Sequence, residues 1–483
     1  MLTRLKVSGF KNLVDVDVRF GPFTCIAGAN GTGKSNLFDA IQFLSALADK
    51  SLIEAALSVR DKDGQTGDIR SLFNRVGDIY EHEMSFEVEM IVPEVGKDHL
   101  NQEAKAAITF LKYHIVLRYR EDYTLHPLGS LELVRETLDR INIGEAPKSL
   151  LFDYSREWKA SVIKGRRTSS FIETEQRPDG TVILLRQDGS SGRPQTRLAA
   201  TLPRTVLSAT NAAESPTAVL AKNEMKSWQL LQLEPTALRH PDEFTDPSVL
   251  GTDGSHLPSV LYRLAHTRTD PEQNVYEQVI FSLRRLLRDV HDLWVERDNQ
   301  RRLLKLKIKD RYDTEHEARA LSDGTLRFLA LSVIDLDPQA QGVICLEEPE
   351  NGIHPERIQA MLELLQGIAV DTDFAVDNDN PLRQVIINTH SPSVIMQIPA
   401  ESLVISEVIE DFDNGLKLPR VSFGCLPDTW RANSIDSIRQ IPIGTLMWYL
   451  NPHAYPSSNP NGNDKQRVID RTELQQLLPG FQD

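Results

Sequence analysis

The stretch GANGTGKS, residues 28–35, constrains the architecture of this 483-residue chain more than any other segment. It satisfies the pattern GxxxxGK[ST] and lies between a short apolar run, Phe23 to Ala27, and a run from Ser35 to Ala48 with apolar residues at helical spacing. Glycines let such a turn fold tightly and point backbone N–H groups at an anion, and the following helix adds its positive N-terminal end. This context favours a phosphate-binding loop over a chance glycine-rich turn.

The motif also predicts that the chain binds ATP and Mg²⁺. We expect Lys34 to reach the β- and γ-phosphates and the Ser35 hydroxyl to ligate the metal ion. The remaining predicted nucleotide contacts of the loop are Gly28, Asn30, Gly31, Gly33 and Asn36.

A second chemistry-bearing run is GVICLEEPENGIHP, residues 342–355. Its apolar residues predict a buried strand that ends at Glu347 and Glu348, and open α/β sheets bind ligands at this end of their strands. We expect Glu347 to hold Mg²⁺ through water and Glu348 to polarise the attacking water. Most paired glutamates are solvated surface, but a buried strand before them and a phosphate loop upstream favour the functional interpretation. The first acid of such a run is usually Asp, so Glu347 lengthens the arm by one methylene.

Two shorter motifs complete the set. In LSDGTLRFLAL, residues 321–331, Ser322 resembles a helix N-cap and Gly324 permits close backbone approach, so this helix start could grip a phosphate or merely pack. In INTHSP, residues 387–392, His390 ends a predicted buried strand and could contact a γ-phosphate, although a lone histidine is more often structural. The order of the four motifs favours the functional interpretation of both.

In this order the motifs resemble those of the RecF/SMC-like ABC ATPases, within the broad group of bacterial AAA family ATPases that share a head domain with the OLD nucleases. The resemblance rests on residues 7–44 and on LSDGT, LEEPENGIHP and NTHSP, and it covers roughly 1–110 and 240–410. It implies an α/β fold: a P-loop head whose mixed or parallel sheet is flanked by helices, with a compact α/β insert and no long coiled coil.

The resemblance also implies roles for single residues. Lys34, Glu348 and His390 would be catalytic, with His390 sensing the γ-phosphate, while Ser322 and Gly324 would act on the ATP of a second protomer. Asn351 would lie in the D-loop of the family. The family's Q-loop glutamine has no clear match, and the segment 69–78 occupies its place, with Arg70 or Arg75 as candidates.

These motifs divide the chain into four predicted parts. They are the first part of the head, 1–115; an insert or lid lobe, 116–240; the second part of the head, 241–410; and a C-terminal extension, 411–483. The extension contains a Pro/Asn/Ser-rich stretch, 451–464, that is typical of a flexible linker, and an apolar run, 441–450, that is either core or a docking surface for a partner. Before the second motif cluster, the pattern predicts a long amphipathic helix over 272–298 and a strand over 303–309.

Charge limits the choice of partners. The chain carries 54 Lys and Arg against 69 Asp and Glu, a net charge of −15, so any contact with nucleic acid must come from a local patch. Lys305, Lys307 and Lys309 share one face of the predicted strand and could track a phosphate backbone. A solvated strand with lysines guarding its edge is the simpler alternative.

Patterns that the sequence lacks indicate the compartment of the protein and whether it carries a nuclease of its own. Cys25, Cys345 and Cys425 have no CxxC spacing and are expected to be buried in a reducing compartment. The N-terminus has no apolar signal region and no stretch reaches 18 apolar residues, so a cytoplasmic location without a membrane span is expected. No acidic or HNH nuclease pattern follows His390.

Taken together, the motifs predict an ATP-hydrolysing subunit that assembles as a homodimer or higher homo-oligomer. By resemblance, its role would be in an anti-phage defence complex, controlling a separately encoded effector such as a nuclease or toxin. Two alternatives stay open: a RecF-like repair or recombination ATPase that binds DNA, and a nucleotide-gated scaffold with little turnover.

Overall fold

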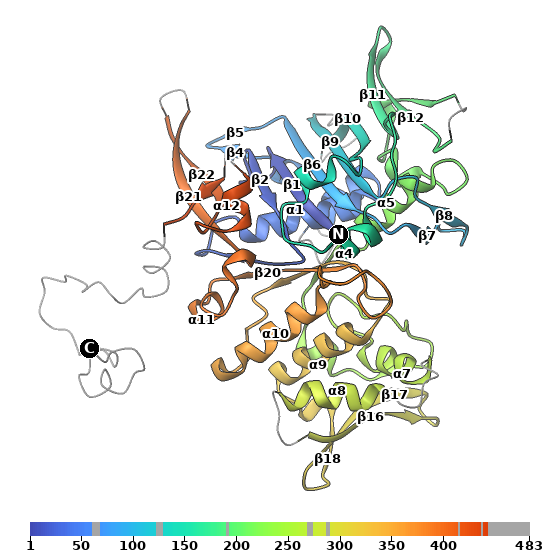
Figure 1. Ribbon diagram of the computed structural model, residues 1–483, viewed down its shortest axis with the longest axis vertical. Helices are drawn as coiled ribbons and strands as arrows, with labels where there is room; N and C mark the ends of the chain where they lie inside the picture. Colours follow the sequence, from blue (N-terminus) through green and yellow to red (C-terminus); the bar gives the residue numbers. More distant parts are fainter. Residues whose placement is uncertain are drawn as a thin grey trace, which may run out of the picture. The chain divides into compact units, whose positions relative to one another are not determined.

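The structure is a computed structural model (Figure 1). It describes residues 1–59, 68–121, 129–189, 193–267, 274–285, 290–413, 416–435 and 438–442. The chain divides into two compact units, Met1–Pro442 and Ile443–Asp483, and all of the described residues belong to the first. The predicted linker at 451–464 and most of the apolar run 441–450 therefore lie outside the described residues.

A seven-stranded sheet forms the centre of the first unit, in the order β14-β19-β20-β3-β21-β22-β23. Its five strands from β14 to β21 run parallel, and β22 is antiparallel to β21. Strands β3 and β20 are buried at every position, as expected for parallel strands covered on both faces. The bounds are Gln229–Leu231 (β14), Gly342–Glu347 (β19), Arg383–Thr389 (β20), Phe23–Ala27 (β3), Leu403–Asp413 (β21), Leu416–Cys425 (β22) and Arg439–Gln440 (β23).

A second, antiparallel sheet has the order β13-β12-β11-β10-β9-β6-β1-β2. Helix α1, Lys34–Leu47, packs against it, because Phe43 lies 5.8 Å from Phe10 and 5.6 Å from Phe86 between ring centroids. The two sheets thereby share one hydrophobic core that anchors the helix after the phosphate loop. The bounds are Leu2–Ser8 (β1), Val16–Arg19 (β2), Glu83–Ile91 (β6), Phe110–Arg120 (β9), Ser130–Arg140 (β10), Ile172–Arg177 (β11), Gly180–Leu185 (β12) and Gln195–Leu198 (β13).

Between β14 and β19 the chain forms a small lobe around helices α7, α8 and α9. Figure 1 shows α8 and α9 beside each other, with α10 packed on α9 and β16 against α8. A small sheet, β15-β17-β16, with β18 beside β17, completes the lobe. The bounds are Asp242–Glu243 (β15), Leu257–Thr267 (α7), Val275–Arg284 (α8), Val290–Asp298 (β16), Leu303–Asp310 (β17), Glu315–Glu317 (β18), Asp323–Leu336 (α9) and Ile358–Ile368 (α10).

The lobe confirms one prediction and corrects another. The predicted strand at 303–309 is β17. The single helix predicted over 272–298 is wrong, because α8 ends at Arg284 and residues 290–298 form strand β16. Leu293 and Val295 of β16 are buried in alternation and face Ile308 and Leu306 of β17, so strand pairing prevails over the helical pattern.

The remaining elements are short. They are α2 (Leu52–Leu57), α3 (Ala146–Ser149), α4 (Arg156–Val162), α5 (Pro216–Lys226), α6 (Pro235–Leu238), α11 (Pro392–Ile395), α12 (Trp430–Ser434), β4 (Arg75–Val76), β5 (Ile79–Tyr80), β7 (Val95–Lys97) and β8 (Glu103–Lys105). The predicted mixed α/β class is confirmed, and the longest helices of the described chain have 14 residues, so no long coiled coil is present there. None of the helices described is both long and apolar enough to cross a membrane.

Candidate functional site

The phosphate loop connects β3 to α1, as its sequence predicts. Gly31 and Gly33 adopt positive φ angles of 81° and 86°, and a Cβ on Gly33 would lie 2.9 Å from the Val421 side chain, so only glycine fits there. Lys34 is 6% exposed and folds back over the loop, where its Nζ donates to the carbonyl oxygens of Gly28 at 2.7 Å and Ala29 at 2.8 Å. The loop thus holds its lysine at the point where a phosphate would replace these two contacts.

Lys34 lies in a field of opposite charge. Burial lowers the pKa of its ammonium group, and the charges of Glu348 and Glu347 partly offset this effect. Both carboxylates come from the end of β19, which β20 separates from β3 in the sheet. The parallel arrangement therefore brings a cation and two acids from distant parts of the sequence to one edge of the sheet.

The two acids are fixed by Asn388, the penultimate residue of β20. The Glu348 N–H donates to the Asn388 carbonyl oxygen at 3.0 Å and to its Oδ1 at 3.1 Å, while Asn388 Nδ2 donates to Glu347 Oε1 at 3.4 Å. Glu348 has a positive φ of 45°, a conformation that costs on the order of 1 kcal/mol for a residue other than glycine. Asn388 therefore binds the strained backbone of Glu348 and the side chain of Glu347 at once.

Glu348 also accepts two side-chain hydrogen bonds. Asn351 Nδ2 donates to Oε2 at 2.9 Å, and His390 Nδ1 lies 2.6 Å from Oε1 with the geometry of an N–H donor. Burial raises the pKa of this carboxyl group, but the bonds from Asn351 and His390 and the charge of Lys34 outweigh it, so the pKa lies below its ordinary value. Glu348 is thus an oriented carboxylate that stays ionised at neutral pH.

These groups meet at one cavity of about 530 Å³. It is lined by Asn12, Asn30, Gly31, Gly33, Lys34, Ser35, Asn36, Glu347, Glu348, Asn351 and Asn388. Ser35 and Glu347 offer a hydroxyl and a carboxylate oxygen to the same space. Mg²⁺ prefers oxygen ligands and retains several waters, so this donor pair fits the metal ion that the sequence predicts.

The predicted signature residues lie elsewhere and are not among the residues that line this cavity. Ser322 is exposed and caps α9, accepting from the Thr325 N–H at 3.2 Å. Gly324 is buried, and a Cβ there would lie 2.6 Å from the carbonyl oxygen of Gly352. Arg327 of α9 donates to the Asn351 carbonyl oxygen at 2.5 Å, which joins this helix to the loop after β19. At the start of α9, Ser322 is therefore exposed to solvent. Arg327, in the next turn, contacts Asn351, whose side chain binds Glu348.

Sequence patterns did not identify Asn12, Asn388 and Gln232 as site residues. Gln232 directly follows β14 and lines a neighbouring cavity of about 600 Å³ that also contacts Glu347 and Glu348. Its sequence context, two leucines after Gln229, is too short to indicate a strand end. Gln232 lies near the two acids, whereas the candidate residues predicted for the Q-loop position do not.

Neither of those candidates, Arg70 and Arg75, lines either cavity. The guanidinium group of Arg70 lies 4.5 Å from the ring centroid of Tyr80, and Arg75 pairs with Asp78 at 2.9 Å. Both arginines therefore serve the local packing of the β4–β5 hairpin.

The lysine face of β17 is neutralised by neighbouring acids. Its pairs are Lys305 with Asp298 at 2.8 Å, Lys307 with Glu317 at 3.3 Å, and Lys309 with Asp313 at 2.8 Å. A strand whose lysines are paired within the chain offers less charge to a phosphate backbone than its sequence suggests. These ion pairs favour a solvated face over a nucleic-acid site, but the expectation that the lysines guard an edge is wrong, because β16 pairs along one side of β17 and β15 and β18 pair along the other.

Comparison with known proteins gives two sequence matches. Residues 4–112 match a family model described as "AAA domain", and residues 161–396 match one described as "AAA domain, putative AbiEii toxin, Type IV TA system". No protein of curated function matches the chain. The first match contains the phosphate loop, and the second contains the acid pair, Ser322 and His390.

Solved structures similar to this chain include SMC head domains. An SMC head bound to the C-winged helix domain of ScpA has 12% identity over 88% of this chain and 98% of that chain, with a TM-score of 0.45. The SMC head domain from Thermotoga maritima has 10% identity, covers 87% and 97%, and has a TM-score of 0.36. An SMC head with an extended coiled coil, bound to the C-terminal domain of ScpA from Pyrococcus furiosus, has 11% identity, covers 88% and 96%, and has a TM-score of 0.40.

Proposed function

We propose that the chain, two segments of which match AAA domain models, binds ATP with Mg²⁺ and hydrolyses it between two copies of itself. The observation that carries this proposal is the meeting of Lys34, Glu347 and Glu348 at one cavity, while Ser322 faces solvent away from it. One copy supplies the phosphate loop and the carboxylates, and the exposed helix start of the second copy closes the γ-phosphate side.

Each residue of the site has a different role in the proposed reaction. Lys34 exchanges its two carbonyl contacts for the β- and γ-phosphates and compensates their charge. Ser35 and Glu347 would hold Mg²⁺, which neutralises charge on the phosphate oxygens when bound. Glu348 orients a water and accepts its proton as the water oxygen bonds to the γ-phosphorus. The bond to the bridging oxygen breaks, and ADP leaves with that electron pair.

His390 and Asn351 both act on Glu348. Their hydrogen bonds hold the carboxylate in one orientation and keep its pKa low. When its ring carries both protons, His390 could in addition donate from Nε2 to a γ-phosphate oxygen, and its side chain is 47% exposed. This would couple the presence of the γ-phosphate to the orientation of the catalytic carboxylate.

We further propose that hydrolysis controls a separate effector in a bacterial defence complex, as the resemblance implies. The longer family match is described as a putative toxin of a type IV toxin–antitoxin system, which supports a role in such a system without naming a separate effector. A repair ATPase that reads DNA directly has less support, because the lysines of β17 are paired with acids.

Steady-state ATP hydrolysis with Mg²⁺, measured with and without double-stranded DNA, tests both the ATPase proposal and the proposed control of an effector. The variant Glu348→Gln serves as the blank. Wild-type hydrolysis that is lost in Glu348→Gln supports the ATPase proposal. Wild-type turnover no higher than that of Glu348→Gln refutes it. Stimulation by DNA would overturn the preference for a partner-gated enzyme and favour the repair alternative. Indifference to DNA supports control by a protein partner.

A further inference from the structure

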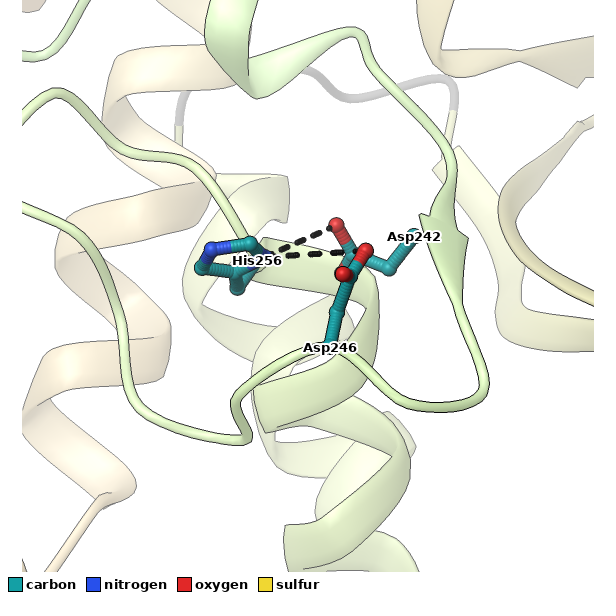
Figure 2. Close-up of side chains that lie close together, drawn as sticks. All are labelled: Asp242, Asp246 and His256. Atoms are coloured by element: carbon teal, nitrogen blue, oxygen red, sulfur yellow. Dashed lines mark ion pairs between the residues drawn. The ribbon is translucent and has the colours of Figure 1, made fainter.

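Three ligand-type side chains meet on the lobe between β14 and α9, away from the nucleotide cavity. They are Asp242 of β15, Asp246 of the loop after it, and His256, the residue before α7 (Figure 2). One ligand atom from each lies within 4.8 Å of the other two, and no other group of three His, Cys, Asp or Glu in the described residues has this spacing. The lobe therefore concentrates two carboxylates and an imidazole at a single point.

The distances among these atoms do not suit direct hydrogen bonds. His256 Nδ1 lies 3.4 Å from Asp242 Oδ1 and 4.0 Å from Asp246 Oδ2, and Figure 2 shows the ring directed at both oxygens. This Nδ1 atom is buried and has no hydrogen-bond partner among the described residues. The Asp242 side chain is only 4% exposed. A buried carboxylate beside an unbonded ring nitrogen is costly unless another group satisfies both.

A second buried polar atom without a partner among the residues described belongs to the residue whose backbone N–H binds this carboxylate. The Ser259 N–H donates to Asp242 Oδ2 at 2.8 Å, and the hydroxyl of Ser259, a residue only 5% exposed, has no hydrogen-bond partner in the described part of the chain. Asp246 is itself fixed, because its Oδ2 accepts from the Glu243 N–H at 2.7 Å. A backbone N–H group of α7 thus orients the Asp242 carboxylate, and one of β15 orients that of Asp246.

We propose that Asp242, Asp246 and His256 bind one divalent transition-metal cation, with zinc as the best-suited ion. Two ligands at about 2.1 Å from a tetrahedral zinc ion lie about 3.4 Å apart, which is the separation of His256 Nδ1 from Asp242 Oδ1, whereas Asp246 Oδ2, at 4.0 Å from Nδ1, would have to move about 0.6 Å closer. An imidazole among carboxylates favours zinc over Mg²⁺, which prefers oxygen ligands alone. Water would complete the coordination on the more exposed side of Asp246.

The position of the cation indicates its role. Arg239 lies three residues before Asp242 and donates to the Leu321 carbonyl oxygen at 2.9 Å and to Asp323 Oδ1 at 2.5 Å. These are the two neighbours of Ser322, which the proposed function places on the ATP of a second copy. The cation would fasten β15 to α7 and so steady the segment that holds this helix start. This last consequence rests on the proposed function, whereas cation binding does not.

The test is equilibrium dialysis of the full chain against zinc without nucleotide, with cobalt absorption as a spectroscopic readout. The variants Asp246→Asn and His256→Asn remove one ligand each while preserving the fold. Asp246 is partly exposed, and asparagine tolerates the left-handed backbone of His256, whose φ is 67°. The control is His316→Asn, which removes a histidine that pairs with Asp310 at 3.0 Å outside any such cluster in the described residues.

We expect one zinc ion per chain in the wild type and in His316→Asn, and an affinity loss of about tenfold or more in the two ligand variants. Absence of stoichiometric zinc in the wild type overturns the proposal, as does equal binding in all four proteins. The variant Lys34→Ala separates this site from the nucleotide site. Retained zinc in that variant supports the proposal even if ATP hydrolysis is never found, and loss of zinc with Lys34 would place the metal at the phosphate loop and refute it.

Discussion

The contact between Gly324 and Gly352 predicts how α9 and the catalytic loop respond to a single methyl group. In Gly324→Ala the new Cβ would lie 2.6 Å from the Gly352 carbonyl oxygen, whereas real Cβ contacts are not found below 3.0 Å. The helix and the loop must therefore separate by at least 3.0 − 2.6 = 0.4 Å. Because the clashing atom belongs to the backbone, no side chain can rotate away, and we expect a loss of roughly 1–3 kcal/mol in the free energy of unfolding.

The same displacement should also lower the rate of ATP hydrolysis. Gly352 follows Asn351, whose side chain donates to Glu348 Oε2 at 2.9 Å. A misplacement of 1 Å can cost about a hundredfold in rate, so a shift of less than half that distance predicts a loss of roughly tenfold in turnover. ATP binding should persist, since Gly324 is not among the residues that line the phosphate cavity.

The matched control is Gly367→Ala, another glycine-to-alanine change within a helix. Gly367 is exposed on α10, and no described atom lies within 4 Å of the position that a Cβ would take there, so alanine should stabilise the chain by about 0.5–1 kcal/mol. Thermal unfolding, ATP titration and steady-state turnover are measured on both variants. If Gly324→Ala unfolds at the temperature of Gly367→Ala and turns over at the wild-type rate, the coupling between α9 and Glu348 is wrong.

Four further outcomes follow from the site. Lys34→Ala should lose ATP binding, measured by titration calorimetry, because no other cation among the described residues lines the cavity; normal turnover would refute the phosphate-loop assignment. Glu348→Gln should bind ATP but hydrolyse it about 10²–10³ times more slowly, or about 2.7–4.1 kcal/mol in barrier height. Since the pKa of Glu348 is lowered, turnover should not fall until the pH drops below about 4.5, and an acid limb near pH 6 would contradict this assignment. Ser322→Arg should leave the exposed helix start folded yet prevent ATP-dependent dimers in sedimentation velocity; a dimer that persists would exclude the two-copy site.

The motifs could be predicted from the sequence because each couples a local pattern to a strand end. An apolar run followed by glycines, by two glutamates or by Thr-His predicts a strand and places its polar end, and parallel strands then gather those ends. This is why Lys34, Glu348 and His390, which lie far apart in the sequence, were expected at one place. The structure brings the three together through β3, β19 and β20.

What the sequence could not supply depends on contacts between distant segments. Asn388 is one of several asparagines, and only its two-sided contact with the Glu348 backbone and the Glu347 side chain distinguishes it. Gln232 is identified only once β14 is known to pair beside β19. The strand at 290–298 was missed for the same reason, since its partner β17 lies beyond a turn and no proline or glycine separates it from α8.

The chain links its exposed helix start to Glu348, the proposed catalytic carboxylate, through one residue. The Asn351 side chain donates to Glu348, and its carbonyl oxygen accepts from Arg327 one turn into α9. If a second copy contacts Ser322, any movement of α9 acts on the backbone of the same residue that orients Glu348. His390 holds the other oxygen of that carboxylate from the end of β20, so the base is fixed from two sides that belong to different parts of the fold. Because Arg327 and Asn351 connect them, the orientation of Glu348 depends on the position of α9. An enzyme whose activity is controlled by its own dimerisation requires such a dependence.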